Sequence, residues 1–274
     1  MARLLSLIRR RRTERLLAAA TAIAALVVVA LPFTAGAGGA GSDQLLPDLK
    51  TRELTDVRTG TDGPGRELRF SNEVLNAGPG VLQVDPDPPG SGDCDGDGGV
   101  ENDRTATQRV YTDADANGGF RRSMDTGYAS SSVGCMVFHP AHGHWHFNDF
   151  ARYKLRRNST GRRVAVSTKV SFCMRDSWRR AGSTPGSPSS PYFEDCAPNA
   201  TMGISVGWSD EYGWSLADQD LDITGLPEAW YCLSSTADPD GRLKEDDDMN
   251  NRASTKLRIT AGSVQVSDNP CSRR

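Results

Sequence analysis

The feature that most constrains the fold is a series of short apolar segments, each followed by a cluster of turn-forming residues. Apolar residues alternate most clearly over 163–173, where Val164, Val166, Thr168, Val170 and Phe172 would share one face of a strand. We therefore expect strands over 68–75, 81–84, 147–155, 163–173, 221–224, 230–234 and 253–259. Neither a long amphipathic helix nor an internal repeat is evident. The pattern predicts an all-β, loop-rich β-sandwich.

Cysteine usage adds a second constraint on this sandwich. The cysteines are Cys94, Cys135, Cys173, Cys196, Cys232 and Cys271. An even number of cysteines in an exported chain predicts disulfides, here three, that staple the fold. The sequence does not choose among the possible pairings. No CxxC pair occurs, which disfavours a thiolate zinc site and a thioredoxin-like motif.

The first 37 residues have the pattern of a secretory signal peptide. An arginine-rich start precedes an apolar stretch from Leu16 to Phe33, and Ala35-Gly36-Ala37 offers a small-x-small cleavage site. We expect cleavage there, which leaves 38–274 as a single secreted domain. If the segment is retained, its apolar stretch of 18 residues is borderline for a membrane span, and the protein would stay at the cell surface.

The charge of the mature chain bears on its partners. Loss of the six arginines and one glutamate of the signal segment takes the formal net charge from −3 to −8. A net negative charge argues against nucleic acid as a partner and favours cationic substrates through long-range attraction. No later segment is apolar enough to span a bilayer, so we expect no membrane contact after cleavage.

All four histidines lie within eight residues, as His139, His142, His144 and His146. The last three are spaced two apart, and side chains at that spacing share one face of a strand but not of a helix. We expect a strand that continues through 147–155, with three imidazoles on one face and His139 outside it. Imidazole is the commonest metal ligand, and an open nitrogen-rich site suits Cu(II) or zinc.

The histidine segment, followed by Phe150, Tyr153 and Leu155, resembles the copper-binding segment of the lysyl oxidases. The resemblance implies that His142, His144 and His146 bind copper and that His139 does not. Scattered motifs extend the resemblance from about residue 46 to residue 271. The Arg-, Ala-, Gly- and Asp-rich composition is typical of a bacterial chain, and no segment resembles the propeptide or scavenger-receptor modules of animal members.

Two further motifs resemble the segments that form the family's cofactor. Lys169 lies in Thr-Lys-Val-Ser-Phe-Cys and Tyr212 in Gly-Trp-Ser-Asp-Glu-Tyr. The resemblance implies that Lys169 and Tyr212 are joined as lysine tyrosylquinone. An electron sink of this kind is needed to oxidise a primary amine, because no natural side chain supplies one. Arg152 stands where animal members have a histidine that could act as the base, so Asp210 and His139 are our candidates for that role.

A third motif, Glu-x-Asp-x-x-Asn-Asn, resembles the calcium cluster of the family. The implied ligands are Asp48, Leu49 through its backbone, Glu245, Asp247, Asn250 and Asn251. Carboxylate and amide oxygens are the donors that calcium takes in large numbers.

The resemblance implies a secreted, copper-dependent amine oxidase. Such an enzyme converts a primary amine, as peptidyl lysine or a small amine, to an aldehyde with release of ammonia and hydrogen peroxide, using dioxygen. Two rival interpretations stay open: a copper-binding β-sandwich module that never forms the quinone, and a three-histidine zinc hydrolase. The second would need a base near the metal, and no HExxH helix is present.

Overall fold

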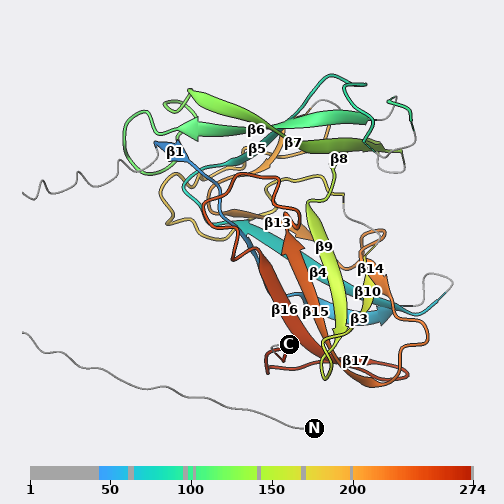
Figure 1. Cartoon of the computed structure of the whole chain (residues 1–274). Helices are drawn as coiled ribbons and strands as arrows, with labels where there is room; N and C mark the ends of the chain where they lie inside the picture. Colours follow the sequence, from blue (N-terminus) through green and yellow to red (C-terminus); the bar gives the residue numbers. More distant parts are fainter. Residues whose placement is uncertain are drawn as a thin grey trace, which may run out of the picture. The chain divides into compact units, whose positions relative to one another are not determined.

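The computed structural model describes residues 43–60, 65–94, 98–100, 103–140, 143–167, 171–197 and 200–272. These residues form strands, turns and loops and contain no helix, so the expectation of an all-β fold is confirmed. Since they include no helix, they include none long enough to cross a membrane. Three antiparallel sheets organise the strands (Figure 1).

The first sheet, which we call the β6 sheet, carries the histidine segment. Its strands are β1 (Gln44–Leu45), β5 (Leu82–Pro86), β6 (Asp103–Thr112), β7 (Tyr128–His139), β8 (His144–Phe147) and β12 (Met202–Ile204). They lie in the order β12-β5-β6-β7-β8, with β1 also paired to β6. The histidine strand β8 is therefore an edge strand among the described residues, hydrogen-bonded to β7.

The second sheet, the β15 sheet, has the order β10-β9-β15-β16-β17. Its strands are β9 (Ala151–Arg157), β10 (Arg163–Val166), β15 (Ala229–Ala237), β16 (Arg252–Ile259) and β17 (Val264–Val266). The third, the β4 sheet, is built around one long strand. It contains β2 (Leu49–Thr51), β3 (Thr55–Gly60), β4 (Glu67–Asn76), β11 (Trp178–Arg179), β13 (Trp208–Tyr212) and β14 (Asp220–Asp222).

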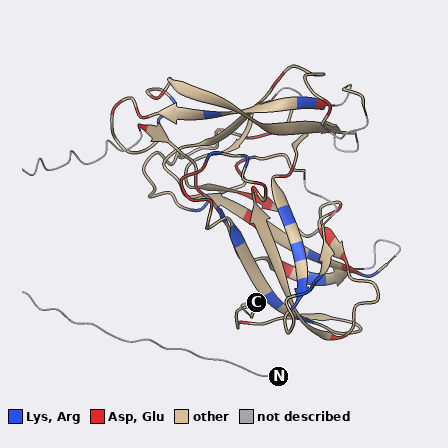
Figure 2. Cartoon of the chain, viewed as in Figure 1, with Lys and Arg blue, Asp and Glu red and all other residues tan. Residues whose placement is uncertain are grey.

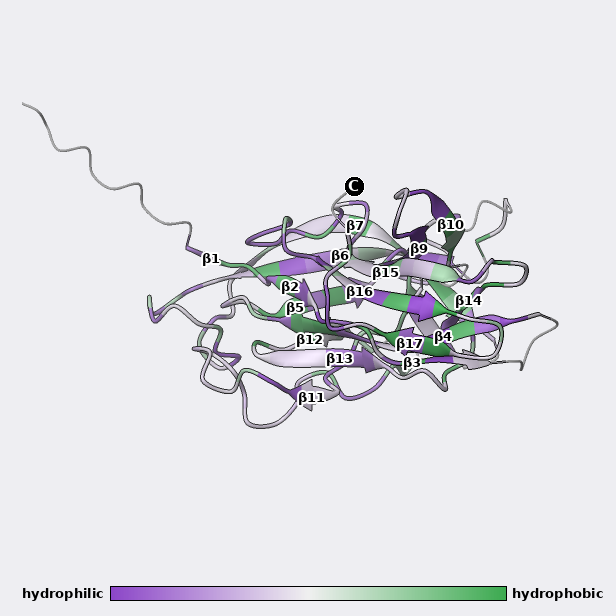
Figure 3. Ribbon diagram, turned by 90° about the horizontal axis from the view of Figure 1, so that it is seen from below, coloured by the Kyte–Doolittle hydropathy of each residue, from purple (hydrophilic) through white to green (hydrophobic). Residues whose placement is uncertain are grey.

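One continuous hydrophobic core joins residues of all three sheets. Phe70 of β4 meets Tyr153 of β9 edge to face, with ring centroids 4.8 Å apart, and both side chains are fully buried. Val84 of β5 and Met136 of β7 bring the β6 sheet into the same cluster. Hydrophobic residues recur along β4 and β5, coloured green in Figure 3. The three sheets thus share one core, and β4, which is buried at consecutive positions, is covered on both faces.

Three disulfides staple the fold, as expected. They join Cys94 to Cys135, Cys173 to Cys196 and Cys232 to Cys271. The first links the connection before β6 to β7, and the last holds the C-terminal segment on β15. With 23 to 41 residues between partners, each disulfide stabilises by about 3 to 4 kcal/mol on loop-closure grounds.

Two predicted strands differ from the structure. The segment 147–155 does not continue the histidine strand, because β8 ends at Phe147 and β9 begins at Ala151 in a different sheet. Phe147 and Phe150 are both buried although they are three apart, a spacing that a straight strand would place on opposite faces. The chain turns between them, with Asp149 at a positive φ of 59°.

The predicted strand 163–173 is shorter than expected. β10 ends at Val166, and a register shift between Arg163 and Ala165 leaves Val166 on the surface, with 44% of it exposed. A bulge of this kind ends the alternation that the sequence suggested. Phe172 instead pairs with Phe147 in an isolated antiparallel bridge, and its side chain is buried in the core.

Candidate active site

The β7–β8 hairpin brings three histidines to one face. His139 is the cross-strand partner of His144, and Val137 is that of His146. Directly opposed residues of an antiparallel pair project to the same side of the sheet. The ring of His146 accordingly lies 4.9 Å from the rings of both His139 and His144. The expectation that His139 lies outside this face is wrong, because the hairpin folds it back onto the other two. His142 lies outside the described residues.

The two described histidines of β8 point nitrogen to nitrogen. Nε2 of His144 lies 3.0 Å from Nε2 of His146, and the side chain of His146 is buried. The other ring nitrogen of His146, Nδ1, lies 3.4 Å from the hydroxyl of Ser171. A partner on Nδ1 fixes the ring and directs Nε2 toward a metal. Trp145 faces the opposite side, where its ring packs against Phe138.

Tyr212 lies at the end of β13, opposite Asn72 of β4, and is buried. Its hydroxyl hydrogen-bonds to the carboxylate of Asp210 and donates to the carbonyl of Cys173 at 2.9 Å. The ring of Phe172 contacts that of Tyr212 edge to face, with centroids 4.3 Å apart. The tyrosine ring is therefore fixed at its hydroxyl and on its face by the segment 172–173.

Asp210 is the strongest candidate for a proton acceptor in the described part of the chain. Burial raises the pKa of its carboxyl to about 7, although hydrogen bonds from Tyr212, the Arg175 backbone and Ser177 lower it in part. Burial also raises the pKa of the Tyr212 hydroxyl well above its usual value, and the charge of Asp210 raises it further. The Tyr212 side chain thus stays neutral near neutral pH, while Asp210 titrates there. His139, our other candidate, belongs to the histidine face.

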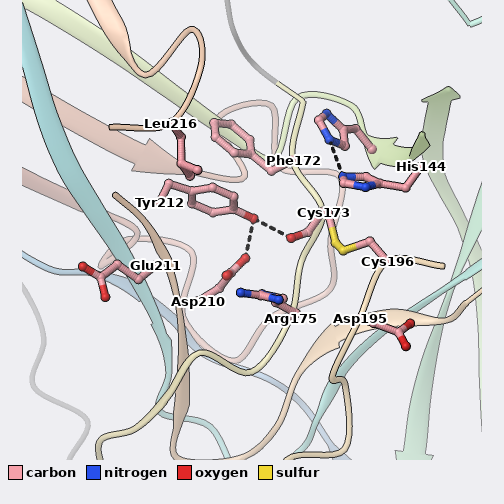
Figure 4. A pocket seen from close by; sticks show the side chains of 11 residues that line it. His144, Phe172, Cys173, Arg175, Asp195, Cys196, Asp210, Glu211, Tyr212 and Leu216 are labelled. Atoms are coloured by element: carbon pink, nitrogen blue, oxygen red, sulfur yellow. Dashed lines mark hydrogen bonds between the residues drawn. A yellow bond between two sulfur atoms is a disulfide. The ribbon is translucent and has the colours of Figure 1, made fainter. Parts of the chain in front are cut away.

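One cavity of about 450 Å³ connects these groups. Its wall includes His144 and His146 from β8, Asp210 and Tyr212 from β13, and the segment 172–175 (Figure 4). Figure 4 shows the Cys173–Cys196 disulfide between His144 and the Tyr212 hydroxyl. Lys169 lies outside the described residues, three positions before Phe172.

Several wall residues were not predicted from sequence. Cys173 and Cys196 lie close to His144, but their sulfur atoms are joined in the disulfide and are not thiolate ligands. Arg175, Asp195 and Glu211 complete the polar wall. Asp195 lies in none of the motifs, and Glu211 lies in the Tyr212 motif without having been predicted as a site residue. Asp195 reaches the cavity because its neighbour Cys196 pairs with Cys173, a pairing that the sequence leaves open.

Arg152, which stands where animal members of the family have a histidine, does not line this cavity. Its guanidinium makes two hydrogen bonds of 3.0 Å to the carboxylate of Asp240. Asp149 lies 3.7 Å from the same group. Arg152 therefore serves an ion-pair cluster on the surface of β9, and it is not among the residues that line the cavity.

A second polar cluster forms where β2 meets the connection before β16. The backbone N–H of Leu49 donates to Glu245 at 2.7 Å, and the side-chain amide of Asn251 donates to the same carboxylate at 2.8 Å. The amide of Asn250 donates to Asp48 at 2.8 Å and to Asp247 at 3.0 Å. All six residues of the predicted calcium motif thus meet at one place, although about 200 residues separate its two halves.

The donor set of this cluster fits a hard cation. The side-chain oxygens of Asn250 and Asn251 are buried and accept no hydrogen bond. Burial raises the pKa of Glu245 to about 8, and hydrogen bonds from Leu49 and Asn251 offset only part of that shift. Buried oxygen acceptors without donors are costly, and a bound Ca²⁺ would use them.

Comparison with known proteins identifies the family. A model of the family named Lysyl oxidase matches residues 129–269, which is about half of the chain. The chain belongs to the lysyl oxidase family. The matched region includes the histidine segment, Lys169, Asp210, Tyr212 and the motif 245–251. Asp48 and Leu49 precede it, and the fold brings them to that motif.

Individual relatives are similar over part of their length. The chain is 33% identical over 125 residues to protein-lysine 6-oxidase from Homo sapiens, which covers 45% of this chain and 28% of that protein. The same figures hold for the protein from Sus scrofa, except that 47% of it is covered. Lysyl oxidase homolog 3B from Danio rerio is 34% identical over 116 residues, covering 42% of this chain and 13% of that protein. The chain therefore matches less than half the length of each of these lysyl oxidase relatives.

Proposed function

We propose that this lysyl oxidase-family chain is a copper-dependent amine oxidase that oxidises primary amines with a lysine tyrosylquinone cofactor. The observation that carries the proposal is the shared cavity. Two facing imidazoles and a buried tyrosine with a carboxylate at its hydroxyl line one space. The relatives named protein-lysine 6-oxidase support a substrate of the same class, a peptidyl lysine or a small amine.

Copper would be held by His144 and His146, with His142 as the third ligand. The two described Nε2 atoms lie 3.0 Å apart, so one ion can contact both. Ser171 holds Nδ1 of His146 and keeps Nε2 directed at the ion. His139 lies against His146 and shields the site from one side. A nitrogen-rich donor set of this kind suits Cu(II).

The quinone would be formed from Tyr212 and Lys169. Lys169 precedes Phe172 by three residues, and the ring of Phe172 lies against that of Tyr212. An extended chain covers about 10 Å in three residues, so a lysine side chain of ordinary length can reach the tyrosine ring. Once formed, the quinone supplies the electron sink for amine oxidation, and copper supplies redox chemistry with dioxygen.

The chain's own residues would provide binding and proton transfer. Asp195 gives the cavity wall negative charge, which attracts the ammonium group of a substrate. The carboxylate of Glu211 points away from the cavity and accepts a hydrogen bond from the Trp178 indole (Figure 4). Asp210 lies in hydrogen-bond contact with the Tyr212 oxygen and has a pKa of about 7, so its ionised form can take a proton near neutral pH. Phe172 and Leu216 form an apolar wall that limits the access of water.

Calcium and export complete the proposal. We assign the cluster of Asp48, Leu49, Glu245, Asp247, Asn250 and Asn251 to structural calcium, because its unpartnered amide oxygens suit that ion. Secretion rests on the signal pattern of residues 1–37, which lie outside the described residues. Three disulfides support an oxidising compartment.

Phenylhydrazine tests the proposal directly. Copper-loaded protein exposed to air should gain a visible hydrazone band with this reagent and should release hydrogen peroxide when given a primary amine. Tyr212→Phe should bind copper equally well and give neither signal. Copper binding without a hydrazone band in the wild type would reject the oxidase and leave a copper-binding module. Tight zinc binding with hydrolase activity would favour the zinc hydrolase.

A further inference from the structure

The outer face of the β15 sheet differs in charge from the rest of the chain. Strands β9, β10, β15, β16 and β17 contain eight lysines and arginines and no aspartate or glutamate. The whole chain carries 35 acidic residues against 32 basic ones. Figure 2 shows the blue residues along β9 and β16. The sequence-level net charge therefore hides a local surface of the opposite sign.

Strand register explains why this surface is hollow. The central strand β15 presents small residues outward, with Cys232 opposite Arg156 of β9 and Thr236 opposite Arg252 of β16. Ser234, between them, faces Lys154 on one side and Ser254 on the other. Long cationic side chains thus stand on both flanking strands, about 10 Å apart, above a floor of small residues. The result is a trough of about 300 Å³.

Among the residues that the structure describes, the wall of the trough offers hydrogen-bond donors and no carboxylate. Arg156, Arg157 and Arg252 line it together with Ser254, and the Cys232–Cys271 disulfide closes one end. None of these three arginines forms an ion pair with a carboxylate of the described residues, unlike Arg152, which Asp240 neutralises. Asn158 is already used, because it exchanges two hydrogen bonds with Ser272.

The cationic side chains of this surface also repel one another electrostatically. Burial lowers the pKa of Arg252, and the charge of Arg156 lowers it further. The pKa of Lys154 is lowered in the same way, first by burial and then by Arg152, Arg156, Arg163 and Arg252. Like charges held together on a rigid sheet are unfavourable unless an anion lies among them.

We propose that this trough is a binding site for tetrahedral oxyanions, phosphate or sulfate groups, separate from the amine-oxidising cavity. Guanidinium groups present planar forks of N–H donors, and a tetrahedral oxyanion has enough oxygen acceptors for several of them at once. The described residues that line the trough include no aromatic side chain, which disfavours nucleic acid, whose bases would need a stacking surface. The groups could be free ions or esters on a linear polymer that follows β9.

The test uses the full chain and four probes: inorganic phosphate, inorganic sulfate, dextran sulfate and uncharged dextran. The variant Arg156→Gln/Arg252→Gln removes one trough-lining cation from each of the two flanking strands. The control Arg58→Gln/Arg121→Gln changes the net charge equally on β3 and in the β6–β7 connection. Affinity is measured by titration calorimetry at low and moderate salt, and melting temperature is measured in parallel.

We expect at least one anionic probe to bind wild type and control at least tenfold more tightly than the trough variant, with no binding of uncharged dextran. Without any anion the trough variant should melt above wild type, because repulsion is relieved. Ser254→Glu, which keeps every arginine and adds a carboxylate, should also lose binding.

Binding of phosphate or sulfate identifies free ions as ligands, and binding of dextran sulfate alone identifies a polymer. Equal affinity of wild type and trough variant, or no binding by any anionic probe, would overturn the site. Copper and quinone play no part in these measurements, so the outcome is independent of the proposed oxidase activity.

Discussion

Two polar clusters in this protein, the first largely buried and the second partly buried, differ in the kind of atom that each offers. The cavity at β8 and β13 combines imidazole nitrogens with a phenol and a carboxylate, and apolar rings line part of its wall. The possible metal ligands of the cluster at Glu245 are all oxygens, and two of them accept no hydrogen bond. Nitrogen donors beside an oxidisable ring suit redox chemistry, whereas oxygen donors alone suit a hard structural ion. The difference teaches that burial by itself does not separate a catalytic site from a stabilising one.

The substitution Tyr212→Phe tests this distinction between the two clusters most strongly. If the cavity performs the chemistry, this variant should lose amine-dependent peroxide production entirely while keeping its copper, because a ring without the hydroxyl cannot enter the oxidation. Tyr231→Phe is the matched control, since Tyr231 is also a buried tyrosine and its hydroxyl donates to the Pro227 carbonyl. Peroxide assays and copper stoichiometry on the three proteins decide the matter. Activity that survives in Tyr212→Phe would remove this tyrosine from the chemistry.

A second, smaller effect is expected at Asp210. Asp210→Asn should lower kcat by about 10²- to 10⁴-fold, the usual range for loss of a proton-transfer group. With a pKa of about 7, the carboxylate is increasingly ionised as pH rises through neutrality, so wild-type activity should rise over the same range. The rise should be absent in Asp210→Asn. Ser177→Ala, which removes one hydrogen bond of 3.2 Å to Asp210, should only shift the midpoint.

Asp210 should also affect stability with a defined sign. Its folded pKa is raised, so its favourable contribution is present below the unfolded pKa of about 4 and is lost as pH rises through about 7. The melting temperature of wild type should therefore fall relative to Asp210→Asn between these limits. A difference that is constant with pH would show that the carboxyl does not titrate in this range.

The cluster to which we assign calcium should affect the stability of the protein and not its amine-oxidising chemistry. Saturating calcium at about 100 times its Kd adds about 2.7 kcal/mol, which corresponds to a rise of about 5 to 10 °C in melting temperature. Glu245→Gln should lose most of that rise, whereas Asp246→Asn, an exposed neighbour outside the cluster, should keep it. The hydrazone band should persist in both. A calcium-independent melting temperature in wild type would mean that the cluster binds no calcium.

The smallest effect is expected at His139, which lies beside the proposed ligands without being one of them. His139→Ala should weaken copper binding by less than His144→Ala does, because it removes a ring packed on His146 and leaves the Nε2 pair intact. Copper affinities of the two variants, measured by competition with a chelator, give the order. Equal losses would make His139 a ligand.

The sequence predicted the fold class and most strand positions, because alternation and turn residues are local signals. β4 and β16 agree with the expected strands within one residue at each end. The prediction from sequence failed at Phe147–Ala151, where the chain passes from one sheet to another, because a local pattern does not show which strands pair with each other. The motif that joins Asp48 to Asn250 came from resemblance alone, since no local signal links residues so distant in the chain.

Within the site, the sequence signals were uneven for a physical reason. Histidine spacing is informative because strands alternate, yet it misplaced His139, whose position depends on the hairpin register. Asp195 and Arg175 became visible only through the Cys173–Cys196 pairing and the path of the chain around it. The basic trough was hidden by the net charge, because its arginines come from strands that meet only in the folded sheet.

The central claim, that Lys169 and Tyr212 become one cofactor, is tested most directly by peptide mapping of copper-loaded, air-exposed protein. Trypsin should leave Lys169 uncut in the peptide 164–175, joined to the peptide 181–242 that contains Tyr212. The Cys173–Cys196 disulfide connects the same two peptides, so the digest must first be reduced and alkylated. The account predicts a branched species that survives reduction in wild type and is absent from Lys169→Arg and Tyr212→Phe. Separate linear peptides in the reduced wild-type digest, with trypsin cutting after Lys169, would contradict it.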